Sequence, residues 1–152
     1  MGGGALLDCG GYPLKLADYL LGGQTEIIDC HLSSCKNHDV DVFGSATLKN
    51  EQGLIAQIAF GMDNSYKCDL EVWGSNGYLI TKRVFTPTAE MQTKINIQTT
   101  KESVVDVEPD DQFFHSAEFF ADCINNIEIR KEHYEIIKHQ AKLFQTIINK
   151  GI

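Results

Sequence analysis

The sequence predicts an α+β domain in which helices cover one face of an open, mostly antiparallel β-sheet. Residues 26–107 alternate between apolar and polar side chains with the period of two that marks strands. Residues 112–150 instead repeat apolar side chains at the spacing of amphipathic helices. A shorter helical pattern lies near the start, at residues 14–21. Because strands are grouped together and followed by helices, the order favours α+β over a parallel α/β sheet.

A short helix is expected near the amino terminus. Pro13 is followed by apolar residues at helical spacing as far as Leu21. Gly22 and Gly23 then provide a natural helix stop. A glycine run, Gly2–Gly4, stands before this helix, and its missing Cβ atoms allow another chain or a ligand to approach the backbone closely.

Several strands are expected next, and most of them are joined as hairpins. They span residues 26–34, 42–48, 54–60, 66–73, 78–84, 93–98 and 103–107. In the first strand Ile28, Cys30 and Leu32 are expected to share one face. Residues 54–60 are apolar on both faces, which is typical of a strand in the middle of a sheet covered on both sides. Asn76-Gly77 is a strong hairpin signal.

Two helices complete the predicted domain. Residues 109–111, Pro-Asp-Asp, end the strand region and supply an N-cap, and residues 113–124 carry apolar side chains at helical spacing. The last helix has an apolar stripe over residues 134–148. These helices can cover only one face of the sheet, so apolar residues on the other face predict self-association, most simply as a two-fold dimer. Phe43, Trp73 and Leu79 are expected on that open face.

Length, composition and charge exclude several classes of function. A chain of 152 residues fits a single domain, residues 1–152. Its net charge of −8 argues against nucleic acid and anionic membranes, because phosphate contacts need clustered Lys and Arg. No apolar run approaches the length of a membrane span, and no signal peptide is visible. Five cysteines at irregular spacing do not form a disulfide framework, which favours a reducing, cytoplasmic location.

Asp8 and Tyr12 are candidate functional residues at the start of the first helix. They lie four residues apart, so one helical turn would point both side chains the same way. In the structural interpretation, Asp8 caps a helix or turn and Tyr12 rests its ring at the edge of the core. In the functional interpretation, the pair takes part in chemistry.

Three strings resemble, in order and spacing, the C-terminal domain of the glucose–fructose oxidoreductase and inositol dehydrogenase (Gfo/Idh/MocA) family. They are the glycine run with D-x-G-x-Y, Trp73-Gly74-Ser75-Asn76-Gly77, and Arg83-Val84-Phe85-Thr86-Pro87. The resemblance covers essentially the whole chain, and its first string is the most specific. It implies an open sheet with helices on one side and a second side free to pair with another subunit. The second and third strings look most like those of members that act on nucleotide sugars.

The resemblance implies an NAD(P)-dependent sugar oxidoreductase, with roles for individual residues. Tyr12 would be the acid/base, Asp8 its partner, and Gly2, Gly3 and Gly4 would let the helix start approach the cofactor. A phenol has an ordinary pKa of about 10, which must fall by about 3 units to serve well near neutrality. Because a nearby anion raises a phenol's pKa, Asp8 is expected to orient Tyr12, a lysine or a substrate hydroxyl.

The family places the cofactor-binding Rossmann domain, and a lysine in a Glu-Lys-Pro motif, before the point where this sequence starts. Neither that motif nor G-x-G-x-x-G is present here. The resemblance therefore implies that NAD or NADP binds to the complete enzyme, and that this chain alone binds no cofactor and is inactive. The alternative is a non-enzymatic dimerisation or binding module on the same scaffold.

Two further residue sets have side chains of the kinds that bind anions or metal ions. Arg83 follows the Asn76-Gly77 hairpin and could hold a sugar phosphate by two parallel hydrogen bonds, although an arginine on a surface strand has the same signature. Cys30, His31 and His38 have the side chains of metal ligands. In an extended strand Cys30 and His31 point to opposite faces, and no second ligand pair completes a set. No metal site is predicted.

Overall fold

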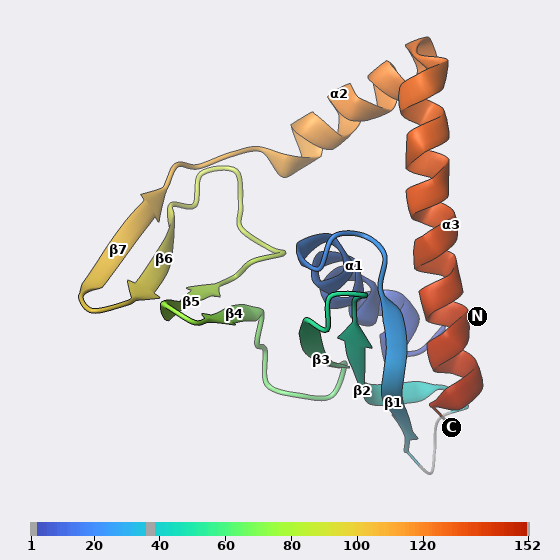
Figure 1. Cartoon of the computed structure of the whole chain (residues 1–152). Helices are drawn as coiled ribbons and strands as arrows, with labels where there is room; N and C mark the ends of the chain where they lie inside the picture. Colours follow the sequence, from blue (N-terminus) through green and yellow to red (C-terminus); the bar gives the residue numbers. More distant parts are fainter. Residues whose placement is uncertain (1–2, 36–38, 152) are drawn as a thin grey trace. The chain divides into compact units, whose positions relative to one another are not determined.

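The computed structural model describes residues 3–35 and 39–151. Their contacts group into two compact units, Met1–Asn64 with Glu128–Ile152 as unit 1 and Ser65–Ile127 as unit 2. The fold class is confirmed, with helices and open antiparallel sheets (Figure 1). The strands form two sheets, ordered β1-β2-β3 and β4-β5-β6-β7. The expectation of a single domain over residues 1–152 stays a prediction.

Unit 1 holds the first helix, the first sheet and most of the last helix. Its elements are a π-helical turn η1 (Leu6–Gly10), α1 (Gly11–Leu20), β1 (Glu26–Ser34), β2 (Asp41–Lys49), β3 (Ile55–Gly61) and α3 (Ile127–Lys150). Unit 2 holds the second sheet and one helix. Its elements are β4 (Asp69–Gly74), β5 (Gly77–Lys82), β6 (Thr93–Gln98), β7 (Glu102–Val107) and α2 (Gln112–Asn125).

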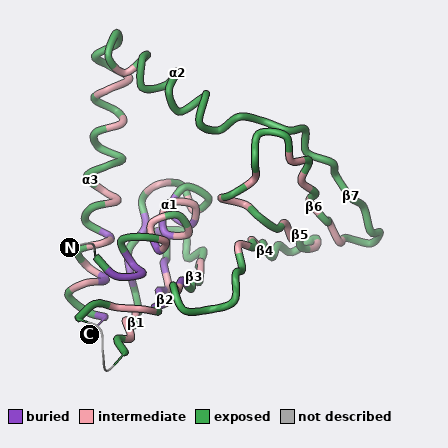
Figure 2. The backbone as a smooth tube through the Cα atoms, turned by 180° about the vertical axis from the view of Figure 1, so that it is seen from behind, coloured by how far each residue is buried: buried purple, intermediate pink, exposed green. Residues whose placement is uncertain are grey.

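The hydrophobic core lies in unit 1, where the buried segments of Figure 2 gather. Helix η1-α1 and the end of α3 pack on one face of the β1-β2-β3 sheet. Four large side chains are fully buried, and they come from η1, α1, β2 and α3: Leu6, Leu14, Leu48 and Ile147. The helices therefore hold unit 1 together through this one sheet face. None of the helices in the described ranges combines the length and apolar character that a membrane span requires.

Strand β1 contains a bulge that the alternating pattern did not predict. Ile27 pairs with Leu48 and Asp29 with Thr47, which leaves Ile28 as an extra residue in the ladder. As a result Ile27 faces the core at 5% exposure, whereas Ile28 is 47% exposed. The prediction that Ile28 shares the inner face with Cys30 was wrong.

Strand β3 was expected in the middle of a sheet covered on both sides, and this was also wrong. In the described part of the chain it is the last strand of a three-stranded sheet, paired with β2 only. Ile58 and Phe60 are buried on the core face, whereas Ile55 is 58% exposed on the other. Apolar residues on both faces of this strand therefore do not reflect two covering layers within unit 1.

The second sheet confirms the predicted hairpin, because β4 and β5 pair across a turn at Ser75-Asn76, with Gly77 as the first residue of β5. Trp73 pairs with Tyr78, and Val72 pairs with Leu79. Side chains alternate between faces along a strand, so Trp73 and Leu79 lie on opposite faces of the sheet. The expectation that both contribute to one open apolar face was wrong.

A buried carboxylate links α1 to α3. Asp18 is 2% exposed, and its Oδ1 atom accepts hydrogen bonds from the Thr25 hydroxyl at 2.7 Å and from His139 Nε2 at 3.1 Å. The His139 side chain on α3 is only 21% exposed. The helix pair is therefore fixed by a polar contact as well as by the core.

The predicted N-cap of α2 is confirmed. Asp111 Oδ1 accepts hydrogen bonds from the backbone N–H groups of Phe113 and Phe114, at 3.1 and 3.0 Å. These bonds satisfy two of the donors that a helix start leaves without partners.

Cysteine reactivity should follow burial. Burial raises the pKa of the Cys9 and Cys30 thiols, so less of each is present as the reactive thiolate near neutral pH. Cys35 is exposed. With iodoacetamide at pH 8 we expect Cys35 to be alkylated about tenfold or more faster than Cys9 and Cys30, measured by peptide mass spectrometry. Equal rates at the three sites in the folded chain would contradict this.

Candidate functional site

Asp8 and Tyr12 lie on one continuous helix in unit 1. Asp8 is in the π-helical turn η1, and Tyr12 is in the first turn of α1. Both side chains are exposed, Tyr12 at 58%. Isolated π-helical turns within α-helices are frequent at functional sites. The sequence thus identified a pair that the structure presents to solvent at the start of a helix whose other face packs on the core.

The helix start is capped by Asp41, which the sequence analysis missed. Asp41 Oδ2 accepts a hydrogen bond of 2.7 Å from the backbone N–H of Leu6. A carboxylate is favourable at this end because the helix dipole is positive there. This observation removes the capping role considered for Asp8, since the carboxylate on the helix start comes from β2.

The glycine run has a structural reason at one position. A Cβ atom on Gly4 would lie 2.2 Å from both the backbone oxygen and Oδ1 of Asp41, so only glycine fits. Gly4 is accordingly buried, whereas Gly3 is exposed. Gly2 lies outside the described residues. Contact between these glycines and a cofactor stays a prediction.

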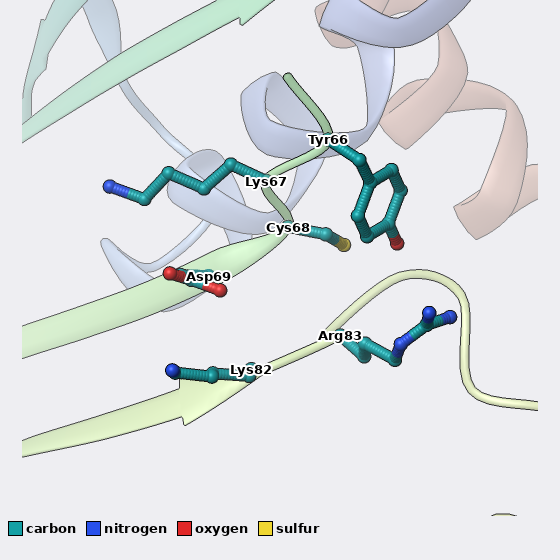
Figure 3. Close-up of a pocket in the computed structure, with 6 residues that line it drawn as sticks. All are labelled: Tyr66, Lys67, Cys68, Asp69, Lys82 and Arg83. Atoms are coloured by element: carbon teal, nitrogen blue, oxygen red, sulfur yellow. The ribbon is translucent and has the colours of Figure 1, made fainter.

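Arg83 lines a surface pocket of unit 2, between the start of β4 and the end of β5. The pocket has a volume of about 270 Å³ and is lined by Tyr66, Lys67, Cys68, Asp69, Lys82 and Arg83 (Figure 3). The hairpin register brings these two chain segments together, because Asp69 pairs with Lys82. Figure 3 shows the Arg83 and Tyr66 side chains on one side of the pocket, and Lys67, Asp69 and Lys82 on the other.

The sequence pattern predicted Arg83 within a strand over residues 78–84. In the structure β5 ends at Lys82, and Arg83 lies just beyond it. Its φ angle is 53°, and no other non-glycine residue in the described ranges has a positive φ. This left-handed conformation ends the strand at Lys82. The Arg83 guanidinium carbon lies 5.3 Å from the centre of the Tyr66 ring, a cation–π contact.

The sequence analysis missed Tyr66 and Lys67 as pocket residues. They were assigned to a strand over residues 66–73, but β4 begins only at Asp69. Counting outward from the Asn76-Gly77 hairpin would have paired residue 69 with residue 82 and placed the two basic segments side by side. The register of this hairpin was therefore the sequence signal that could have identified the pocket residues.

The candidate metal ligands do not converge in the residues that the structure describes. Cys30 packs against the core from the inner face of β1, and His31 lies on the exposed outer face, as expected for neighbours in a strand. His38 lies outside the described residues. Among residues 3–35 and 39–151, no group of three or more His, Cys, Asp or Glu is arranged to hold a metal ion.

The chain is similar to known proteins over nearly its whole length. The family model described as the GFO/IDH/MocA C-terminal domain matches residues 1–80. A dTDP-3,4-didehydro-2,6-dideoxy-alpha-D-glucose 3-reductase from Actinomadura kijaniata is 38% identical over 148 residues, covering 97% of this chain and 45% of that protein. The enzyme of the same name from Saccharopolyspora spinosa is 38% identical over 106 residues, covering 70% of this chain and 31% of that protein.

A solved structure extends this likeness to three dimensions. A mutant of a 3-ketoreductase from Actinomadura kijaniata, crystallised with TDP-benzene and NADP, superposes with a TM-score of 0.93 at 36% identity. The superposition covers 99% of this chain and 48% of that one. The chain thus spans about half the length of the relatives it matches.

Proposed function

This chain belongs to the GFO/IDH/MocA C-terminal domain family, and we propose its function on that basis. Its function, we infer, is that of the substrate-binding domain of an NADP-dependent oxidoreductase that reduces a keto group on a dTDP-linked sugar. The observation that carries the proposal is the likeness in fold over 99% of the chain to a 3-ketoreductase bound to NADP and a TDP compound.

Tyr12 is proposed as the proton donor to the carbonyl oxygen. Reduction of a ketone adds a hydride to carbon and a proton to oxygen, and the nicotinamide cofactor supplies the hydride when bound. Tyr12 carries a hydroxyl on an exposed ring at the start of α1, so a substrate oxygen can reach it. Asp8 lies one helical turn away and, as a carboxylate, has no proton to donate to the carbonyl oxygen. We therefore assign Asp8 to orienting the substrate or Tyr12.

The glycine run does not fit the phosphates of the cofactor. The helix start beside Gly3 and Gly4 already carries the Asp41 carboxylate on Leu6 N–H, and a phosphate placed there would be repelled. Any contact of these glycines is therefore proposed to be with an uncharged part of NADP. The phosphates of NADP are proposed to bind to another part of the complete protein.

The 152-residue chain alone is expected to bind neither NAD nor NADP with micromolar affinity. Tight dinucleotide binding requires a strand–turn–helix unit with backbone N–H groups aimed at the pyrophosphate, and the chain has no G-x-G-x-x-G string. Isothermal calorimetry tests this directly. A dissociation constant near 1 µM for either cofactor would contradict the assignment of cofactor binding to another part of the protein.

The complete protein is proposed to dimerise through one face of the β4–β7 sheet. The ladder places a row of apolar side chains on that face: Leu70, Val72, Leu79, Ile95, Ile97 and Val105. Val72 and Val105 are 39% and 45% exposed. Burying such a surface against a second copy is favourable, and standard interfaces bury about 800 Å² per partner.

A pair of variants on neighbouring residues tests this interface. Leu79→Asp places a charge on the apolar face and is expected to shift the protein to monomers in sedimentation equilibrium at micromolar concentration. Tyr78→Asp is the matched control, because Tyr78 lies on the opposite face of the same strand. A monomeric parent protein, or equal effects of the two variants, would contradict the proposed interface.

A further inference from the structure

Arg83 is held in a defined orientation before any ligand binds. Its guanidinium lies over the Tyr66 ring, and the Tyr66 hydroxyl hydrogen-bonds to the Thr86 hydroxyl. The backbone that follows is fixed to the segment just before β4, because Val84 N–H donates to the Cys68 carbonyl at 3.0 Å. A stacked arginine loses less side-chain freedom when it binds a ligand than an unconstrained one. The left-handed backbone at Arg83 is a second sign of a site held against local preference.

The charge around Arg83 is unusual for an acidic chain. Lys67, Lys82 and Arg83 line the pocket together with a single carboxylate, Asp69, although the whole chain carries a net charge of −8. Within the described parts of the chain, none of these three cations has a carboxylate oxygen at ion-pair distance. Three cations that form no ion pair repel one another, and the single Asp69 carboxylate offsets only part of their charge. A bound anion would relieve that repulsion.

The three cationic side chains would act on a bound anion in two ways, by direct hydrogen bonds and by the positive electrostatic potential that they create. The two lysines extend on the opposite side of the pocket from Arg83 (Figure 3), so one small anion does not touch all three. The planar guanidinium can make two parallel hydrogen bonds to phosphate oxygens. The lysines raise the local positive potential without needing direct contact.

We propose that the Arg83 pocket binds the diphosphate group of a nucleotide, with Arg83 as the contact residue and Tyr66 as the residue that positions it. The phosphate chemistry follows from the pocket. The identification of the nucleotide as the dTDP end of the substrate rests on the proposed function. NADP also carries phosphate groups, so the two sources have to be separated by experiment.

The proposal is tested by calorimetric titration of the 152-residue chain at constant ionic strength. The ligands are pyrophosphate, dTDP, thymidine and NADP, each titrated separately. Pyrophosphate and dTDP are expected to bind, thymidine is not, and dTDP is expected to bind more tightly than NADP. Arg83→Gln should weaken dTDP binding by about tenfold or more, because it removes charge-assisted hydrogen bonds. Lys101→Gln removes an exposed cation elsewhere in unit 2 and should change affinity by less than about twofold.

Further variants keep the result interpretable. Arg83→Gly removes the side chain at a position whose backbone suits glycine, so this variant should fold at least as stably and still lose dTDP binding. Tyr66→Leu should weaken binding by about three- to tenfold through loss of the stacked ring. Tyr66→Phe keeps the ring and should bind nearly as the parent does.

Three results would overturn the proposal. They are an absence of pyrophosphate and dTDP binding at millimolar concentration, equal losses for Arg83→Gln and Lys101→Gln, and tighter binding of NADP than of dTDP at this pocket. The binding assay does not depend on turnover. Arg83-dependent binding in a protein that reduces no sugar would therefore reject the proposed function and keep the phosphate site, and turnover without Arg83-dependent binding would do the reverse.

Discussion

Tyr12→Phe is expected to lower kcat for ketone reduction by about 10²–10⁴-fold in the complete protein, the range typical for loss of a general acid. The substitution removes only the phenolic oxygen and keeps the ring. Because the side chain is 58% exposed, the core is not disturbed and the free energy of unfolding should change by about 1 kcal/mol or less. The measurement is NADPH consumption with a dTDP-linked keto sugar at saturating substrate, together with a thermal melt.

Tyr19→Phe is the matched control for this experiment. Tyr19 lies on the same helix, α1, and is 73% exposed, so the two variants differ only in position along the helix. We expect Tyr19→Phe to leave kcat within about twofold of the parent value, as is usual for exposed positions away from a site. If Tyr12→Phe also changes kcat by less than threefold, Tyr12 is a structural residue. An inactive parent protein would favour the non-enzymatic module.

Asp18→Ala is expected to lower the free energy of unfolding by about 3 kcal/mol, because it leaves buried donors without an acceptor. Those donors are the Thr25 hydroxyl and His139 Nε2, both bonded to Asp18 Oδ1, with Thr25 N–H at a longer 3.3 Å. Loss of this contact also removes the polar link between α1 and α3. Urea unfolding of the 152-residue chain, followed by circular dichroism, measures the difference.

Two control variants separate the hydrogen bonds from the charge. Asp18→Asn keeps an acceptor oxygen of the same size, so it should lose less than half as much stability as Asp18→Ala. Asp63→Ala removes an exposed carboxylate from a bend in the same unit and should change stability by about 0.5 kcal/mol or less. A loss below about 1 kcal/mol for Asp18→Ala would mean that water replaces the carboxylate in this site.

The sequence predicted well the strands in which apolar and polar side chains alternate without an inserted residue. Residues 42–48 alternate strictly, and β2 spans Asp41–Lys49. The prediction failed at Ile28, because a bulge inserts one residue and shifts the faces of the strand on one side of it. The partner strand decides where such an insertion occurs, and the alternation within β1 alone does not record it.

The candidate site was predictable where its residues are close in sequence. Asp8 and Tyr12 were found because they lie one turn apart within a recognisable string. Asp41 lies 35 residues from the Leu6 N–H that it caps, and Asp18 lies 121 residues from His139. Contacts of this kind depend on how helices and strands pack, so a periodicity or a spacing does not reveal them.

The wide turn η1 has a consequence for how the length of this segment can vary among related proteins. Leu6 is fully buried, and its N–H bonds to Asp41, so the positions on both sides of the turn are fixed. Deleting one residue between Leu6 and Gly10 would rotate everything before the deletion, Leu6 included, by about 100° relative to α1. Leu6 would then leave the core and lose its bond to Asp41. Related sequences should therefore keep a constant number of residues here, and insertions and deletions should collect in the loops between strands.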